Sequence, residues 1–290
     1  MSGFEIKGKV NTAICYAKVV EPEAIEQIRR MCDYVITEET KIRIMPDVHA
    51  GKGCTIGTTM TIKDKAVPNV VGVDIGCGMY TVNLGNIKID FEKVDEPAHF
   101  IPSGRNVWEG RQEKFDLTKL RCYRELKNTK WLERSLGTLG GGNHFIEIDE
   151  AADGTKYLII HSGSRNLGKQ VAEFYQQLAV NLDRGYGEYL EKRDEIIRTY
   201  KEQGRRKEIQ QALEKLHWQV YESETNMPED LCFLSGKYLD DYLYDVEICQ
   251  AFAKRSREKM AEIILERTGM LGREAFHLSL IHISEPTRRT

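Results

Sequence analysis

Hydrophobic and polar positions along this chain follow two different periods, which predict both helices and strands. Residues 22–31 begin with a proline and carry acidic residues early and arginines late, a pattern typical of a short helix. Residues 41–48 alternate, with Ile42 and Ile44 on the same face, and indicate a strand. The first part of the chain is therefore expected to combine helix and strand.

The segment from Pro46 to Leu84 is dense in glycine, with short β-branched runs between the glycines. Two of these runs, Thr58–Ile62 and Val70–Val73, favour short strands separated by tight loops. Helical patterns return around 107–134. We therefore expect the middle of the chain to pass from sheet to helix.

Two further strands are predicted beyond residue 140. Residues 145–148 follow the glycine cluster Gly140–Gly142, and residues 156–160 follow a turn at Gly154. The second of these strands is apolar enough to be buried and ends at His161.

The remaining pattern is helical. Residues 168–223 are charged and helix-periodic, which predicts two antiparallel helices forming an excursion, and residues 238–268 predict a further helix. The charges of the excursion suit a solvated helical face or, alternatively, a contact with RNA. The fold class predicted is α+β, with mixed sheets carrying a site at the strand ends and helices outside.

Composition excludes several classes of protein. The chain has 290 residues with 41% hydrophobic and 30% charged residues, enough to bury a sizeable core as one large domain or two small ones. No apolar run approaches the roughly 18–20 residues of a membrane span, so no membrane partner is expected. The net charge of −3 gives no global basic field, although a local basic groove is still allowed.

The cysteines indicate a reducing compartment. Seven are scattered singly without a CxxC pair, which argues against a disulfide framework. The first residues contain no apolar segment of the secretory type. We therefore expect a cytoplasmic protein.

Candidate chemistry begins at Asp74 and Cys77, which lie three residues apart with glycines on both sides of the cysteine. A hard carboxylate beside a soft thiolate suits a borderline transition metal, and the glycines let the backbone fold tightly around a ligand. The alternative is that Cys77 is a small buried hydrophobic residue and Asp74 a turn residue.

Two histidines strengthen the metal hypothesis. His144 directly follows the glycine cluster and His161 ends the next predicted strand, so both lie where a strand meets a loop. A single histidine at such a place is more often structural. Together with Asp74 and Cys77, however, the pair predicts a divalent-metal site for nucleotidyl or phosphoryl chemistry.

Other residues have weaker context. Gly140–Gly142 can present backbone N–H groups to an anion or act as a hinge, and Arg165 can bind phosphate or lie on the surface. His49 and Lys52 stand in a glycine-rich segment that we expect near the site. The two histidines without such context, His99 and His217, are expected to be structural.

Four motifs together resemble one family. They are Met45–Gly53 (MPDVHAGKG), Val73–Met79 (VDIGCGM), Gly140–Phe145 (GGGNHF) and His161–Arg165 (HSGSR). In this order they resemble the RtcB family of RNA-splicing ligases, and the resemblance runs to about residue 277.

The resemblance implies a reaction and its cofactors. The family joins RNA ends that carry a 3′-phosphate or a 2′,3′-cyclic phosphate to 5′-hydroxyl ends, using GTP and two Mn²⁺ ions. Metal ligands would be Asp74, Cys77 and His144 for one ion, with Cys77 bridging to a second ion that His161 also holds.

The same resemblance implies nucleotide contacts. Asn143 would lie beside the GTP phosphates, Glu147 would pair with the guanine edge, and Arg165 would bind phosphate. The guanylylated histidine of the family would lie downstream of residue 290.

The last residues depart from the family pattern. Residues 278–290 resemble the translation of a sequencing-library adaptor, so we expect a single ligase domain over 1–277, incomplete at its end, and a non-native tail. His282 would occupy the place of a third metal histidine by chance. This chain is then expected to bind Mn²⁺ but not to form a GMP adduct.

Two other functions remain open. A metal-dependent RNA phosphatase or nuclease would share the metal site without a covalent step. A non-catalytic module that binds RNA ends would need no metal, and the grouping of Asp74, Cys77, His144 and His161 weighs against it.

Overall fold

The computed structural model describes residues 3–51, 55–216 and 227–279. These fall into two compact units, each of which combines separate parts of the chain. The first unit contains residues 1–70 and 175–236, and the second contains residues 71–174 and 237–290. The single-domain prediction for 1–277 stays a prediction.

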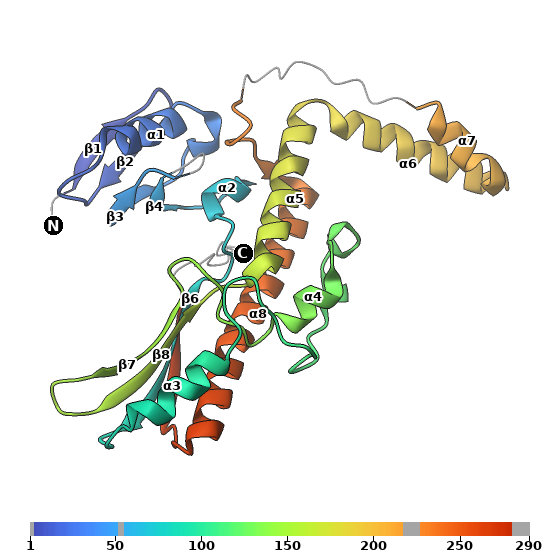
Figure 1. Cartoon of the computed structure of the whole chain (residues 1–290). Helices are drawn as coiled ribbons and strands as arrows, with labels where there is room; N and C mark the ends of the chain where they lie inside the picture. Colours follow the sequence, from blue (N-terminus) through green and yellow to red (C-terminus); the bar gives the residue numbers. More distant parts are fainter. Residues whose placement is uncertain (1–2, 52–54, 217–226, 280–290) are drawn as a thin grey trace, which may run out of the picture. The chain divides into compact units, whose positions relative to one another are not determined.

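The first unit contains a mixed four-stranded sheet with strand order β1-β2-β3-β4. Its strands are β1 (Phe4–Lys7), β2 (Thr12–Cys15), β3 (Ile42–His49) and β4 (Ile56–Met60). β2 and β3 are parallel, whereas the two outer pairs are antiparallel. Parallel neighbours need a crossover connection, and helix α1 (Pro22–Cys32) supplies it beside the sheet (Figure 1). The predicted helix and mixed sheet are confirmed.

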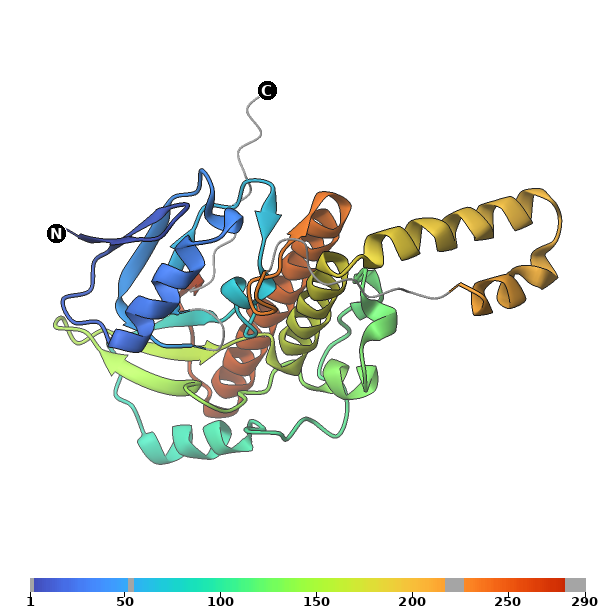
Figure 2. The same ribbon diagram turned by 90° about the horizontal axis from the view of Figure 1, so that it is seen from above.

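The rest of the first unit is mostly helical. It includes the end of α5 (Arg165–Asp183), then α6 (Tyr186–Glu202) and α7 (Ile209–Glu214), which folds back beside α6 (Figure 2). The helical excursion is confirmed, although it contains more helices than the two predicted. A two-stranded sheet pairs β5 (Lys65–Ala66) with β9 (Leu234–Ser235).

The second unit contains an antiparallel sheet with strand order β10-β6-β8-β7. Its strands are β6 (Gly78–Gly85), β7 (Phe145–Glu150), β8 (Lys156–Ser162) and β10 (Glu274–Ser279). The pairing places His161 opposite both Met79 and Phe145. This register brings the start of β6, the start of β7 and the end of β8 together at the same end of the sheet.

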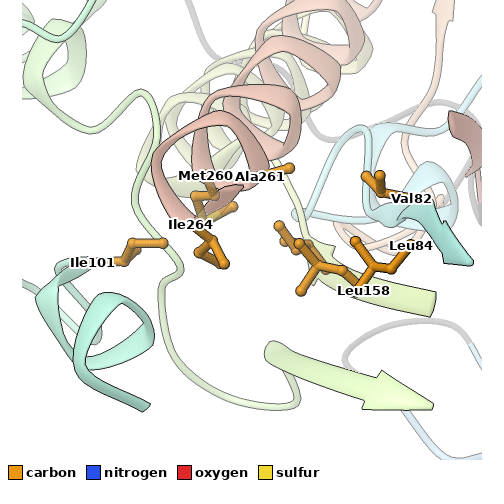
Figure 3. Close-up of a cluster of buried hydrophobic side chains, with 8 residues drawn as sticks. Val82, Leu84, Ile101, Leu158, Met260, Ala261 and Ile264 are labelled. Carbon is orange, nitrogen blue, oxygen red and sulfur yellow. The ribbon is translucent and has the colours of Figure 1, made fainter. Parts of the chain in front are cut away.

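Helix α8 (Gly236–Thr268) packs on this sheet and forms the core of the second unit. Figure 3 shows the cluster, in which residues of β6, β8 and α8 meet Ile101, the residue after α3 (Phe91–Phe100). Its members are Val82, Leu84, Ile101, Leu158, Ile160, Met260, Ala261 and Ile264. Burial of these side chains fixes α8 against the strands that carry the candidate site.

The buried face of α8 also carries charge. Asp245 is fully buried, and its carboxylate accepts hydrogen bonds from the backbone N–H groups of Arg121 (2.7 Å) and Cys122 (3.0 Å). These two bonds satisfy backbone N–H groups of a turn that has no longer helix beside it. Only the short 3-10 turns Leu117–Lys119 and Tyr123–Glu125 flank this turn.

Two sequence predictions are wrong. The strand expected at Val70–Val73 is absent, because Pro68 starts the short helix α2 (Pro68–Val71) and Gly72 takes a φ of +96°. The helical pattern at 107–134 gives only 3-10 turns and α4 (Thr129–Arg134), since side chains such as Asp245 satisfy the backbone there.

Residues 278 and 279, which the sequence assigned to the tail, belong to β10 and pair with Met79 and Gly78. The other tail residues, including His282, lie outside the described part of the chain. Among the described helices, none combines the length and apolar character needed to cross a bilayer.

Candidate metal centre and adjacent cavity

The Asp74–Gly78 segment is a tight turn between α2 and β6. Its fold depends on Gly76, which has a φ of +78° and lies so close to α8 that a Cβ would approach Ala253 Cβ to 2.9 Å. The Cys77 N–H donates to the Asp74 carbonyl (3.0 Å) and closes the turn. The two candidate ligands therefore come from one short loop that is held against the helix.

The two histidines enter from neighbouring strands. His144 immediately precedes β7, and His161 lies near the end of β8. Their rings lie 5.5 Å apart in an edge-to-face arrangement. His161 is only 3% exposed, and the His144 side chain is 7% exposed. Both rings are thus fixed by packing before any ligand binds.

The second nitrogen of each ring shows how the pair is oriented. His144 Nδ1 donates to the Leu139 carbonyl (2.9 Å), and His161 Nδ1 donates to the Gly78 carbonyl (3.2 Å). Because a carbonyl oxygen only accepts, both Nδ1 atoms carry the proton. In the neutral rings the Nε2 lone pairs are then directed into the site, as a metal ligand requires.

These nitrogens meet the loop residues. His144 Nε2 lies 3.0 Å from Asp74 Oδ2, and His161 Nε2 lies 3.6 Å from Cys77 Sγ. The ligand atoms of Cys77, His144 and His161 all lie within 4.8 Å of one another. The structure therefore brings together the four residues that the sequence singled out, and their mixed N, O and S donors fit a borderline transition metal.

Burial sets the protonation of the site. Desolvation, with a further contribution from the Asp74 carboxylate, raises the pKa of the Cys77 thiol to about 12. Desolvation, followed by repulsion from His144, lowers the pKa of His161. His161 is then neutral near pH 7, whereas Cys77 keeps its proton until a cation displaces it.

Arg257 is a site residue that the sequence analysis missed. It projects from α8, is 3% exposed, and its Nη1 donates to the carbonyls of Gly76 (2.8 Å) and Ser162 (2.6 Å). One side chain therefore ties the Cys77 loop to the end of β8. Its positive charge also opposes the rise in the Cys77 pKa. A signal was present, because Arg257 falls in the mostly apolar buried stripe of α8 that also contains Ala253 and Met260.

Two glycines leave room for the site. A Cβ at Gly163 would lie 1.9 Å from Asp74 Oδ1. A Cβ at Gly140 would lie 1.9 Å from Arg165 Nη1 and 2.8 Å from His144 Nδ1. Close approach of these side chains is therefore one reason for the glycine at both positions.

Arg165 is held in place and is not a free surface residue. Its Nε donates to Thr138 Oγ1 (3.0 Å) and its Nη2 donates to the Gly104 carbonyl (2.7 Å). Its φ of +62° is unfavourable for a side chain of this type, and such strain is common at functional sites. Burial lowers the Arg165 pKa, opposed by the Asp74 carboxylate.

A cavity of about 610 Å³ opens beside the metal group. Its charged and polar lining includes Asp74, Arg105, Asn143, Arg165 and Lys169, and Trp131 adds an aromatic face. The cations outnumber the carboxylate, so the cavity suits an anionic ligand of moderate size.

The other candidates belong to other elements of the fold. Glu147 is exposed on β7, where partial desolvation of its carboxylate and repulsion from the Asp149 carboxylate raise its pKa. His49 ends β3 in the first unit, and its Nδ1 donates to the Asp47 carbonyl (3.0 Å). His99 is exposed on α3. Lys52 and His217 lie outside the described residues.

Three of the four motifs supply the residues of this site, and the resemblance extends into a match over most of the chain. Residues 30–101 and 109–281 match the family described as tRNA-splicing ligase RtcB. The chain belongs to the RtcB family. RtcB from Escherichia coli K12, named an RNA-splicing ligase, is 31% identical over 253 residues, which cover 77% of this chain and 52% of the relative. The tRNA-splicing ligase RtcB of Archaeoglobus fulgidus is 28% identical over 228 residues, 59% of this chain and 46% of the relative.

This RtcB-family chain spans about half the length of the curated relatives it matches. The matched range contains Asp74, Cys77, His144 and His161. The residues named above as lining the cavity also lie in the matched ranges, except Arg105, which falls in the unmatched segment 102–108.

Proposed function

We propose that this chain supplies the metal-binding site of an RNA ligase that joins 3′-phosphate or 2′,3′-cyclic phosphate ends to 5′-hydroxyl ends with GTP and Mn²⁺. The observation that carries this proposal is the convergence of Cys77, His144 and His161, with Asp74 in contact, beside a cationic cavity in an RtcB-family chain. Ligation is proposed for the protein by relationship, whereas metal binding is proposed from the residues themselves.

The donor set fits a pair of Mn²⁺ ions. Asp74, Cys77 and His144 would hold one ion, and Cys77 with His161 would contribute to the second. Bound divalent cations orient phosphate groups and neutralise their negative charge. The protein's own contribution is to hold both imidazoles by their Nδ1 protons and to keep the thiol buried until the metal arrives.

The same proposal assigns contacts with GTP to three residues. Asn143 and Arg165 line the cavity, so an amide and a guanidinium are available to phosphate oxygens. Glu147 offers a carboxylate on β7 that could accept hydrogen bonds from the N–H edge of guanine. The nucleophilic histidine that the family resemblance implies is not assigned to any described residue.

Calorimetric titration of the metal-free chain with Mn²⁺ tests the metal site. Wild-type protein should bind Mn²⁺, and Cys77→Ala should abolish or strongly weaken binding, because the thiolate is shared by both proposed ions. Cys232→Ala is a matched control, since Cys232 is also a buried free cysteine but lies in the other unit. Unchanged Mn²⁺ binding by Cys77→Ala would contradict the proposal.

A second assay separates the alternatives. RNA strands with 3′-phosphate and 5′-hydroxyl ends are incubated with Mn²⁺, with and without GTP. Joining that needs GTP supports the ligase. Release of phosphate without GTP would instead support a phosphatase, and RNA binding that ignores both Mn²⁺ and Cys77→Ala would support a non-catalytic module.

A further inference from the structure

The cavity beside the metal group contains features that metal binding does not explain. Arg105, Trp131 and Lys169 all line it, and none of them belongs to the Cys77, His144 and His161 group. Lys169 lies one turn beyond Arg165 on α5, and its ammonium lies 3.7 Å from the exposed Glu173 carboxylate. The outer part of the cavity therefore combines cations with a large aromatic surface.

Arg105 is presented by an anchored turn. The Asn106 N–H donates to the Ser103 carbonyl (3.1 Å), and the Gly104 N–H donates to the Gly140 carbonyl (2.8 Å). The Gly104 carbonyl in turn accepts from Arg165 Nη2 (2.7 Å). Arg105 thus follows directly on a residue that accepts a hydrogen bond from Arg165, and both arginines line the cavity.

Trp131 belongs to the short helix α4, which is anchored by a buried neighbouring side chain and by a backbone hydrogen bond. The next residue, Leu132, is fully buried, and the Trp131 N–H donates to the Asn128 carbonyl (2.8 Å) at the start of α4. The indole itself is half-buried and lines the cavity. An anchored, partly exposed indole at a cationic cavity is the arrangement on which proteins stack the bases of single-stranded nucleic acids.

The lining favours a ligand recognised by stacking and charge. Among the described residues that line the cavity, Asp74 is the only carboxylate, and it contacts His144. The cavity therefore has no second carboxylate for the N–H edge of guanine. A volume of about 610 Å³ lies within the roughly 300–1,000 Å³ range of ligand sites.

We propose that this cavity binds the terminal nucleotide of the RNA strand that ends in a 3′-phosphate, with the base stacked on Trp131. The 3′-phosphate lies between the metal group and Arg165, and the preceding phosphate meets Arg105 and Lys169. Stacking does not distinguish the bases, so the site accepts any terminal nucleotide. This inference rests on the proposed function, because it assumes that the metal group acts on an RNA end.

Fluorescence anisotropy tests the proposal with a labelled ten-nucleotide RNA ending in a 3′-phosphate, titrated with the full chain in Mn²⁺. Trp131→Ala should weaken binding about tenfold, and Trp131→Phe should restore most of it, because stacking needs only an aromatic face. Phe91→Ala is the matched control, since Phe91 is 69% exposed on α3 and does not line the cavity.

The charge contribution is measured separately. Arg105→Ala should weaken binding and reduce its salt dependence, whereas Lys114→Ala, an exposed cation that does not line the cavity, should leave both unchanged. Strands that differ only in the terminal base should bind equally.

The outcomes distinguish the two proposals. If Trp131→Ala binds RNA like wild type while Mn²⁺ binding is intact, the stacking site is refuted and the metal site stands. If Trp131→Ala weakens GTP binding instead of RNA binding, the cavity belongs to the nucleotide and the inference is overturned. If Cys77→Ala does not change Mn²⁺ binding, the proposed function itself fails.

Discussion

Replacing Arg257 by methionine tests whether the buried cation organises the metal loop. Methionine keeps most of the length of the side chain, so little cavity is created. The change removes the two hydrogen bonds that Arg257 Nη1 donates to the carbonyls of Gly76 (2.8 Å) and Ser162 (2.6 Å). It leaves both carbonyls without this donor at the point where the loop joins β8.

The change in the free energy of unfolding is the loss of two hydrogen bonds minus the gain from removing a buried charge. Hydrogen bonds from a charged donor contribute about 1.5–3 kcal/mol each, so two of them would account for roughly 3–6 kcal/mol. Removing the charge offsets part of this loss, because Arg257 Nε is buried without a partner among the described residues and burial lowers the Arg257 pKa. We expect a net loss of about 2 kcal/mol, which lowers Tm by roughly 4–8 °C.

The effect on metal binding has a separate cause. Arg257 lowers the pKa of Cys77, so its removal raises that pKa further and makes the thiolate harder to form. Mn²⁺ affinity should therefore fall in Arg257→Met and recover in part in Arg257→Lys, which keeps the charge but not the planar group. Thermal unfolding followed by circular dichroism and calorimetric titration with Mn²⁺ measure the two effects.

Arg255→Met is the matched control on the same helix. Arg255 pairs with the partly exposed carboxylates of Glu113, Glu258 and Glu262, and pairs of this kind stabilise a protein little. The Arg255→Met variant should therefore bind Mn²⁺ with unchanged affinity. Unchanged Tm and unchanged Mn²⁺ affinity in Arg257→Met would refute the role assigned to Arg257.

Three further predictions concern packing and protonation. Gly163→Ala should weaken Mn²⁺ binding in calorimetry, because its Cβ would lie 1.9 Å from Asp74 Oδ1, and unchanged affinity would contradict this account. Ile264→Ala should cost about 2–5 kcal/mol in urea unfolding, since Ile264 is fully buried in the core of the second unit; a loss well below 1 kcal/mol would contradict that packing. Mn²⁺ affinity should rise with pH through the neutral range, because the metal displaces the proton of a Cys77 thiol whose pKa is about 12, whereas a pH-independent affinity would exclude Cys77 as a ligand.

Much of the second unit could be predicted from the sequence because its signals are local. The strands that end near His144 and His161 were marked by apolar runs bounded by glycine, and α8 by a long periodic stripe. The candidate ligands were recognisable for the same reason, since their residue types are rare and each stands beside a glycine-rich turn. Their grouping in space is what the structure adds.

The error at 107–134 and the omission of Arg257 arose where distant residues decide the local structure. Backbone N–H groups near Arg121 are satisfied by Asp245, 124 positions away, so a helix-like pattern forms turns instead. The contact of Arg257 with Gly76 spans 181 positions. Local periodicity contains no information on such pairings, although a charge on the apolar stripe of a helix indicates that some pairing exists.

The two buried charges of α8 have a consequence for how this protein can vary among its relatives. Asp245 and Arg257 are twelve positions apart on one continuous helix, a rise of about 18 Å. Inserting or deleting one residue between them would turn Arg257 by about 100° away from the metal loop while Asp245 kept its turn. Insertions and deletions among the relatives should therefore occur in irregular segments such as 107–128. They should be absent between Asp245 and Arg257, because the number of residues between these two side chains determines where Arg257 meets the metal loop.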